Sequence, residues 1–350
     1  MMSGLHDEAG NVRGRVAVMY AGLIAFNVTT WAWAVLAFRG HTSLIGTALL
    51  AYSLGLRHAV DADHITAIDN VTRKLMKQGK RPVGVGLMFS LGHSTVVVAG
   101  SMAMADAGLG VAHHMDWLRA VGAWAGTAVS SLFLLAIAMV NLVVLRGVWR
   151  TYLRVRHGGE FIEEDLEQML GDRGIFARLF RPLFRMIERS WQMYPLGVLF
   201  GLGFDTATEI GLLGIAAAEA SKGLPIAAIL VFPALFAAGM SLVDTTDNVL
   251  MVGAYGWASV RPVRKLFYNL TVTALSAAVA LAVGGVEALG LIERQTHAGG
   301  DFWGIVRTVN SNLGLVGYGI IALFAVVWAA AAAIYKWRRI GSLEQEQAES

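Results

Sequence analysis

The residues of this chain with the clearest capacity for chemistry are histidines and carboxylates placed inside apolar stretches. The densest group is the run RHAVDADH at residues 57–64. At about 100° per residue, His58, Asp61 and His64 share an arc about 120° wide on a regular helix, and Asp63 falls outside it. The wheel therefore predicts that the first three face one cavity. Asp63 joins them only if the helix opens locally, or it serves as a hydrogen-bond partner of a histidine.

Three later apolar stretches carry the same residue types. Their polar residues are Ser90, His93, Asp205, Glu209, Asp244 and Asp247. With Asp61, Asp63 and Asp69, seven carboxylates lie inside apolar stretches, against the single cation Arg57. An ionisable side chain at the centre of a membrane helix costs about 2.5 to 3.5 kcal/mol. A positive ligand is therefore expected to compensate them, although an ion pair of Asp61 with Arg57, one turn apart, is the simpler alternative for that residue.

The available donor atoms favour a borderline divalent metal ion. The chain has no cysteine, so thiolate chemistry and a disulfide framework are excluded. A soft Cu(I) site is disfavoured without sulfur, and an all-oxygen magnesium or calcium site would not need histidines. Imidazole and carboxylate together suit Ni²⁺, Co²⁺ or Zn²⁺, and the donor types alone do not separate these three ions.

The composition predicts a membrane protein. Of the 350 residues, 56% are apolar and 15% are charged, against about 25% charged in soluble domains. Stretches of about 20 apolar residues are long enough to span a bilayer. Eight stretches meet that length: Val16–Phe38, Leu44–Asn70, Val83–Ala105, Val121–Leu145, Leu196–Ala220, Pro225–Tyr255, Leu266–Gly290 and Leu313–Trp337. We predict an all-α polytopic protein, with residues 1–350 forming one transmembrane domain.

The distribution of basic residues predicts the orientation. With the N-terminus inside, 22 of the 28 Lys and Arg residues fall in cytoplasmic segments, five fall in outer loops and Arg57 lies within a span. This asymmetry places both termini in the cytoplasm and the protein in the cytoplasmic membrane among lipids. The basic residues behind the net charge of +3 are explained by this membrane orientation, so no nucleic-acid partner is predicted. The long connection at about 146–194 is predicted to hold an amphipathic cytoplasmic helix, with a purely solvated loop as the alternative.

Four motifs in these stretches resemble those of the nickel/cobalt transporter family, the NiCoT permeases. The family signature of His, four residues and then Asp-His is matched by His58, Asp63 and His64. The other three follow in the expected order: LGHST at 91–95, LGFDTATE at 202–209 and GMSLVDTTD at 239–247. The resemblance implies eight spans with both termini inside, and it implies that His58, Asp63 and His64 bind metal. Because the helical wheel favours Asp61 instead, both aspartates are retained, with the greater weight on Asp63.

The resemblance further implies high-affinity uptake of Ni²⁺ and Co²⁺ across the cytoplasmic membrane. The metal is then the transported substrate, and no cofactor is expected. We place it near the midplane on His58, His64 and an aspartate, with His93 as the partner from the third stretch. An acidic path or proton-coupling set is predicted from Ser90, Asp205, Glu209, Asp244 and Asp247. The chain has no ATP-binding motif, which indicates a secondary transporter.

Rival functions remain open at this point. Efflux of the same metals uses the same residue types, because these do not encode direction. An intramembrane metalloenzyme would need a compact three-ligand site with an open position and a spacing such as HExxH, which the chain lacks. Bis-histidine haem binding is weakened because His58, His64 and His93 form no evident pair at matched depth on two helices.

Overall fold

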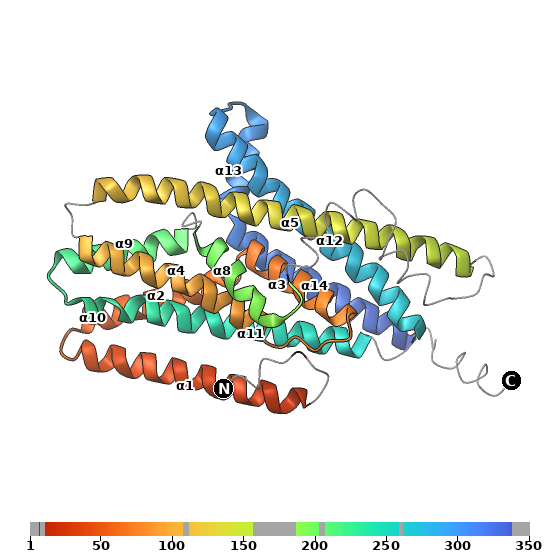
Figure 1. Cartoon of the computed structure of the whole chain (residues 1–350), viewed down its shortest axis with the longest axis horizontal. Coiled ribbons are helices and arrows are strands. Elements are labelled where there is room, and N and C mark those ends of the chain that lie inside the picture. Colours follow the sequence, from red (N-terminus) through yellow and green to blue (C-terminus); the bar gives the residue numbers. More distant parts are fainter. Residues whose placement is uncertain are drawn as a thin grey trace.

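A computed structural model describes residues 7, 11–107, 112–156, 187–202, 207–258 and 262–337 of the chain. Every regular element within these ranges is helical, and most helices run along the long axis of one elongated bundle (Figure 1). The helices are α1 (Val12–Ala37), α2 (Thr42–His58), α3 (Ala62–Lys77), α4 (Val85–Ala107), α5 (Ala112–Arg156), η2 (Ser190–Gln192), α8 (Met193–Gly201), α9 (Ala207–Ser221), α10 (Ile226–Ile229), α11 (Val231–Ala258), α12 (Pro262–Thr296), α13 (Asp301–Asn310) and α14 (Leu313–Trp337). The predicted all-helical class is confirmed for these residues.

Among the described residues, five helices are long and apolar enough to cross a membrane, or six if α13 and α14, bent by 72°, form one span. Two predicted spans are missing from this count. Residues 44–70 are divided into α2 and α3, and residues 196–220 contain parts of α8 and α9, between which residues 203–206 lie outside the described part of the chain. The multi-pass character is therefore supported, whereas the number of eight spans stays a prediction.

The helix predicted over residues 44–70 is interrupted at Ala59–Asp61. At the end of α2 the amides of Val60 and Asp61 donate to carbonyls three residues back, those of Arg57 and His58, at 3.1 and 2.9 Å. Asp61 then adopts an extended backbone with φ −63° and ψ 145° before α3 begins. These tight turns satisfy the amides that a break inside a bundle would otherwise leave unpaired. The local opening that the sequence left as an option is therefore present.

Two glycines of α14 pack directly against this interruption. A Cβ added at Gly317 would overlap the carbonyl oxygen of Val60. A Cβ added at Gly314 would lie 2.7 Å from Oδ1 of Asp61. Small residues let two backbones approach in this way at membrane helix interfaces. The last helix therefore holds the non-helical segment in place, although it lies more than 250 residues away in the sequence.

Glycines also join α4 to α8. A Cβ at Gly92 would overlap the carbonyl of Tyr194, and a Cβ at Gly197 would overlap the carbonyl of Phe89. The contact is reciprocal, so the two helix backbones touch at one crossing. Gly92 precedes His93, and this close packing therefore determines where the imidazole of α4 lies.

One end of the bundle gathers segments that the charge pattern assigns to a single side. The amide of Arg81 donates to the carbonyl of Asp7 at 2.9 Å, and the amide of Ser190 donates to the Asp7 carboxylate at 2.8 Å. A Cβ at Gly256, near the end of α11, would lie 2.6 Å from the Arg81 guanidinium. We call this region the basic end. Helix α5 continues into the predicted 146–194 connection as far as Arg156, and the amphipathic helix predicted there falls outside the described residues.

The packing of α14 gives a first prediction. Gly317→Ala is expected to lower the free energy of unfolding by about 1–3 kcal/mol or more, because the added methyl group collides with backbone that cannot move aside freely. Thermal unfolding of the purified protein in detergent measures the change. Gly319→Ala is the matched control on the same helix, because nothing lies within 4 Å of the Cβ it adds. Equal unfolding temperatures for the two variants would contradict the proposed packing.

Candidate metal centre

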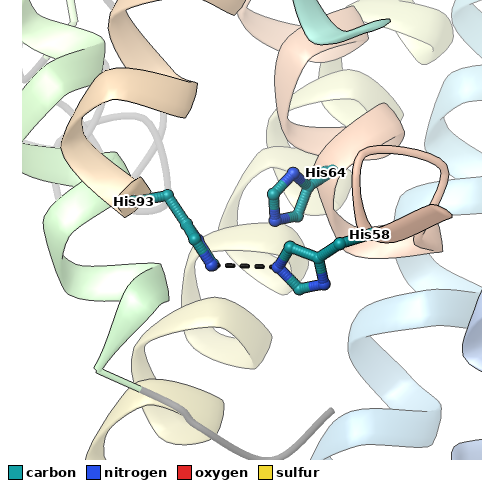
Figure 2. Close-up of side chains that lie close together, drawn as sticks. All are labelled: His58, His64 and His93. Carbon is teal, nitrogen blue, oxygen red and sulfur yellow. Dashed lines mark hydrogen bonds between the residues drawn. The ribbon is translucent and has the colours of Figure 1, made fainter. Parts of the chain in front are cut away.

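Three histidines from three helices converge in the interior of the bundle. His58 is the last residue of α2, His64 lies in the first turn of α3 and His93 lies midway along α4, and all three are at most 2% exposed. One ligand nitrogen from each can be chosen so that all lie within 4.8 Å of one another. The rings face a common space (Figure 2). The structure therefore brings together the three histidines that the sequence singled out.

Glu209 of α9 completes this group. Its Oε1 lies 2.8 Å from Nε2 of His93 and 3.9 Å from Nε2 of His58, and its side chain is 2% exposed. The two histidine Nε2 atoms are themselves 2.9 Å apart. The sequence assigned Glu209 to an acidic path, whereas the structure places its carboxylate against two imidazoles.

These separations suit a single metal ion. With bonds of about 2.1 Å, neighbouring ligand atoms stand about 3.0 Å apart in octahedral and about 3.4 Å apart in tetrahedral coordination. The three edges formed by His58, His93 and Glu209 are 2.9, 2.8 and 3.9 Å and bracket those values. A ring nitrogen of His64 belongs to the same group, because it lies within 4.8 Å of a nitrogen of each of the other two histidines. Three imidazoles and one carboxylate form a donor set for borderline divalent ions.

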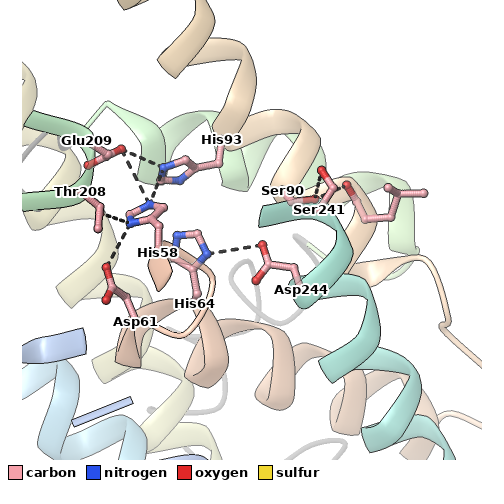
Figure 3. Close-up of polar contacts among 10 residues, drawn as sticks. His58, Asp61, His64, Ser90, His93, Thr208, Glu209, Ser241 and Asp244 are labelled. Atoms are coloured by element: carbon pink, nitrogen blue, oxygen red, sulfur yellow. Dashed lines mark hydrogen bonds and ion pairs between the residues drawn. The ribbon is translucent and has the colours of Figure 1, made fainter. Parts of the chain in front are cut away.

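The far nitrogen of His58 is held by two neighbours. Its Nδ1 lies 3.0 Å from Oδ2 of Asp61 and 3.0 Å from Oγ1 of Thr208 (Figure 3). If Nδ1 donates its proton to the Asp61 carboxylate, Nε2 carries a free lone pair directed at the cluster. Histidine ligands in metal sites are commonly oriented by a carboxylate in this manner. Asp61 thus contacts His58, whereas the sequence left open an ion pair with Arg57.

His64 faces a different carboxylate. Its Nδ1 lies 3.5 Å from Oδ2 of Asp244, on the side of the ring away from His58 (Figure 3). This distance exceeds that of a well-formed hydrogen bond. Both nitrogens of His64 and both carboxylate oxygens of Asp244 have no hydrogen-bond partner among the described residues. Buried polar atoms are normally paired, so unpaired ones mark a place where a ligand is expected.

The remaining predicted residues take no part in the contacts described so far. Asp63 is half-buried and lines a cavity of about 280 Å³ that also reaches Asp61 and Thr208. Ser90 donates to the hydroxyl of Ser241 at 3.1 Å, and this pair lies beyond Asp244 (Figure 3). The half-buried Asp247 lines a second, apolar cavity together with residues of α14. Asp205 lies outside the described residues.

Sequence reasoning missed the partners of the third aspartate in this region. Asp69 is fully buried and accepts hydrogen bonds from the hydroxyl of Tyr255 and, at 2.8 Å, from that of Ser276. These donors come from α11 and α12. No spacing in the sequence connects them to Asp69, because the pairing depends on how distant helices pack. Thr208 was also given no role, although its position beside Glu209 was the available signal.

The fold and this cluster define a helical membrane protein with cation-binding groups in its interior. A family model described as high-affinity nickel-transport protein matches residues 44–334, and the chain therefore belongs to that family. This is a family of transport proteins and not of enzymes, and nickel or cobalt is its substrate rather than a cofactor.

Three relatives illustrate the breadth of the family. The chain is 55% identical to a high-affinity nickel transport protein of Cupriavidus necator over 97% of this chain and 96% of the relative. It is 46% identical to the nickel transporter NicT of Mycobacterium tuberculosis, over 93% and 90% of the two chains. It is 40% identical to the cobalt transport protein NhlF of Rhodococcus rhodochrous, over 82% of each. No solved structure matches the chain.

The cluster predicts that metal stabilises the folded protein. Ni²⁺ or Co²⁺ at 100 times its dissociation constant is expected to add about 2.7 kcal/mol to the free energy of unfolding, because the ion binds only the folded cluster. Thermal unfolding in detergent, with and without the ion, measures this. Mg²⁺ at the same concentration is the control, because it prefers oxygen ligands. An equal effect of Mg²⁺ and Ni²⁺ would show that the stabilisation does not come from imidazole ligands.

Proposed function

We propose that this protein takes up Ni²⁺ and Co²⁺ across the cytoplasmic membrane as a high-affinity secondary transporter. The observation that carries the proposal is the convergence of His58, His93 and Glu209, with ligand atoms 2.8 to 3.9 Å apart inside an apolar bundle. The names of the relatives support the choice of metal, since they include both nickel and cobalt transport proteins. The absence of an ATP-binding motif favours an ion gradient, or trapping of metal inside the cell, as the energy source.

The proposed ligands are Nε2 of His58, Nε2 of His93, a ring nitrogen of His64 and Oε1 of Glu209. Asp61 acts on the metal indirectly, by orienting His58 through Nδ1. This assignment differs from the roles given from the sequence. Glu209 moves from the acidic path to the ligand set, and Asp61 orients the ligand His58 instead of binding the metal itself. Because imidazole must be neutral to bind metal, protons compete with the ion, and acid pH is expected to weaken binding.

We assign Asp63 to the entry route rather than to the ligand set. Its carboxylate lines the 280 Å³ cavity that reaches Asp61 and Thr208, both of which contact His58. A water molecule in the liquid occupies about 30 Å³, so this cavity is large enough for a partly hydrated divalent ion. The ion would exchange its remaining water for imidazole nitrogens as it moves from this cavity to the cluster.

The proposed topology has eight spans, one of them interrupted at Ala59–Asp61, with both termini in the cytoplasm. The basic end of the bundle supports it, because Asp7, Arg81 and Ser190 meet there and belong to segments that the charge pattern assigns to the inside. Uptake then runs from the opposite end toward the basic end.

Accumulation of labelled metal tests the function. Cells that express the chain are expected to accumulate ⁶³Ni²⁺ and ⁵⁷Co²⁺ above the level of cells without it, with weak competition by Mn²⁺. His58→Ala, His64→Ala and His93→Ala each remove an imidazole and are expected to abolish this uptake. Comparable expression of each variant in the membrane fraction has to be shown first.

Ser131→Ala is a suitable control for these variants. Ser131 of α5 is also buried, but its hydroxyl donates to the carbonyl of Ala128 in its own helix at 3.2 Å, so its loss is expected to leave accumulation near the wild-type level. Reduced rather than raised metal content in expressing cells would show that the protein exports the ion. Normal accumulation by all three histidine variants would refute the ligand assignment.

The two aspartates near the break can be told apart. Asp61→Asn is expected to weaken Ni²⁺ binding about 10- to 100-fold, because a neutral amide oxygen is a weaker acceptor than a carboxylate for the hydrogen bond from Nδ1 of His58. Asp63→Asn is expected to slow uptake while leaving the dissociation constant near that of the wild type. Equilibrium dialysis of the purified variants against ⁶³Ni²⁺ separates the two effects. Loss of binding by Asp63→Asn, with binding by Asp61→Asn intact, would instead make Asp63 the ligand.

A further inference from the structure

Beyond the histidine cluster, α11 carries a set of buried polar atoms that have no partner. Asp244, Thr245 and Asn248 are each at most 1% exposed. Both carboxylate oxygens of Asp244, Oγ1 of Thr245 and Oδ1 of Asn248 have no hydrogen bond to any described residue. These residues lie within about 100° of one another on the helix. Buried acceptors without donors cost about 1–3 kcal/mol each, unless a ligand supplies positive charge.

No lysine or arginine among the described residues forms an ion pair with Asp244, although Nε and Nη1 of the nearby Arg73 are also buried without a hydrogen-bond partner. The amide nitrogen of Asn248 donates to Oγ1 of Thr72 on α3 at 2.7 Å, which directs its oxygen elsewhere. Arg73, a buried cation of α3, donates to Oδ1 of Asn70 at 3.0 Å. Asp244 has one recorded ion-pair contact with a described residue, to Nδ1 of His64 at 3.5 Å. On the side of α4, a Cβ at Gly86 would overlap the carbonyl of Asp244, so that helix closes the space tightly.

We propose that Asp244, Thr245 and Asn248 form a second, oxygen-donor site for a divalent cation, which takes the transported ion after it leaves the histidine cluster. This inference rests on the proposed function. It assigns to Asp244 a binding role and adds Thr245 and Asn248, which belong to no assigned site. Asp247 is not included, although its Oδ2 is also buried without a partner, because the residue as a whole is half-buried and lines the apolar cavity beside α14.

The position of the site argues for the transported ion as its occupant. Asp244 lies directly beside His64, so an ion bound by the histidines has this carboxylate as its neighbour (Figure 3). From this level α3 runs on to Lys77 and α11 to Ala258, and both continue toward the basic end where Arg81 lies against Gly256. Thr72 and Asn248, which are in contact, come after His64 and Asp244 on these two helices and so lie closer to the basic end. The second site therefore lies on the inner side of the first.

The chemistry of the donors fits a release step. Borderline ions such as Ni²⁺ and Co²⁺ bind imidazole nitrogen more strongly than neutral oxygen ligands, whereas oxygen donors suit harder cations. An ion that moves from three imidazoles to one carboxylate, an amide oxygen and a hydroxyl is held less tightly. Transport requires sites that bind well enough to admit an ion and weakly enough to release it. A weak site inward of a strong one satisfies both conditions.

Equilibrium binding of ⁶³Ni²⁺ to the purified, tag-free full chain tests the proposal. The wild type is expected to bind one ion tightly and a second at least ten-fold more weakly. Asn248→Leu, which keeps the size of the side chain but removes its oxygen, is expected to lose the weak class and keep the tight one. His58→Ala is expected to do the reverse. The saturated uptake rate of Asn248→Leu is expected to fall about ten-fold in cells, with the tight dissociation constant unchanged.

Two adjacent threonines provide a matched pair. Thr245→Val removes a hydroxyl from the site and is expected to weaken the second class about ten-fold. Thr246→Val is the control, because its hydroxyl donates to the carbonyl of Leu242 at 2.7 Å and contacts Tyr20 on α1. If Asn248→Leu does not fold, as judged by size-exclusion chromatography, Thr245→Val still tests the site.

Three results would overturn the proposal. One is a wild type that binds a single ion while its histidine cluster is intact. Another is a weak class that survives both Asn248→Leu and Thr245→Val. The third is displacement of the weakly bound Ni²⁺ by millimolar Na⁺, which would make the site one for a coupling ion. A wild type that binds no Ni²⁺ at all would instead refute the proposed function, so the two failures are distinguishable.

Discussion

The interruption of the helix at Ala59–Asp61 is the feature on which the rest of the metal centre depends. On a continuous helix, residues 58 and 64 would be separated by about 9 Å along the axis, at 1.5 Å per residue. Ligands of one ion have to lie within about 4 Å of one another when the bonds are about 2.1 Å long. The break brings the ring centroids of His58 and His64 to 4.6 Å. Without it, the two histidines of one motif would lie on the same side of a helix but at different depths.

A break of this kind has to be supported from outside, because non-helical backbone inside a membrane is tolerated only where protein surrounds it. Helix α14 supplies that support, because Gly314 and Gly317 have no side chains and let Asp61 and the Val60 carbonyl pack directly against the helix. Asp61 makes no cap for α3 and turns its carboxylate to His58 instead. The same short segment therefore ends one helix, begins another and orients a histidine.

Much of this was predictable from residue types and periodicity. Hydropathy located the five helices that are long and apolar enough to cross a membrane, and the histidines and buried acids were identified as candidates because charge is costly in a membrane. The helical wheel related Asp61 to His58, although it assumed a regular helix. The wheel could not predict contacts between distant helices. The approach of Glu209 to His93 depends on the packing of α9 against α4, and the donors to Asp69 lie 186 and 207 residues further along the chain. Asp205 and the amphipathic segment of the long connection lie outside the described residues and remain predictions.

The glycine contact between α4 and α8 has a mechanical consequence. Their backbones touch at Gly92 and Gly197, so His93 has to follow any shift of α8. The same kind of contact continues through the bundle, because a Cβ at Gly86 of α4 would overlap the carbonyl of Asp244 and a Cβ at Gly55 of α2 would overlap that of Phe236, both on α11. The helices that carry His58 and His93 are therefore coupled through α11, and an ion bound by both histidines would add a direct cross-link between them. These helices could then separate only as fast as the ion exchanges its ligands, so the exchange kinetics of the metal, and not only its affinity, would limit the pace of the protein's motion.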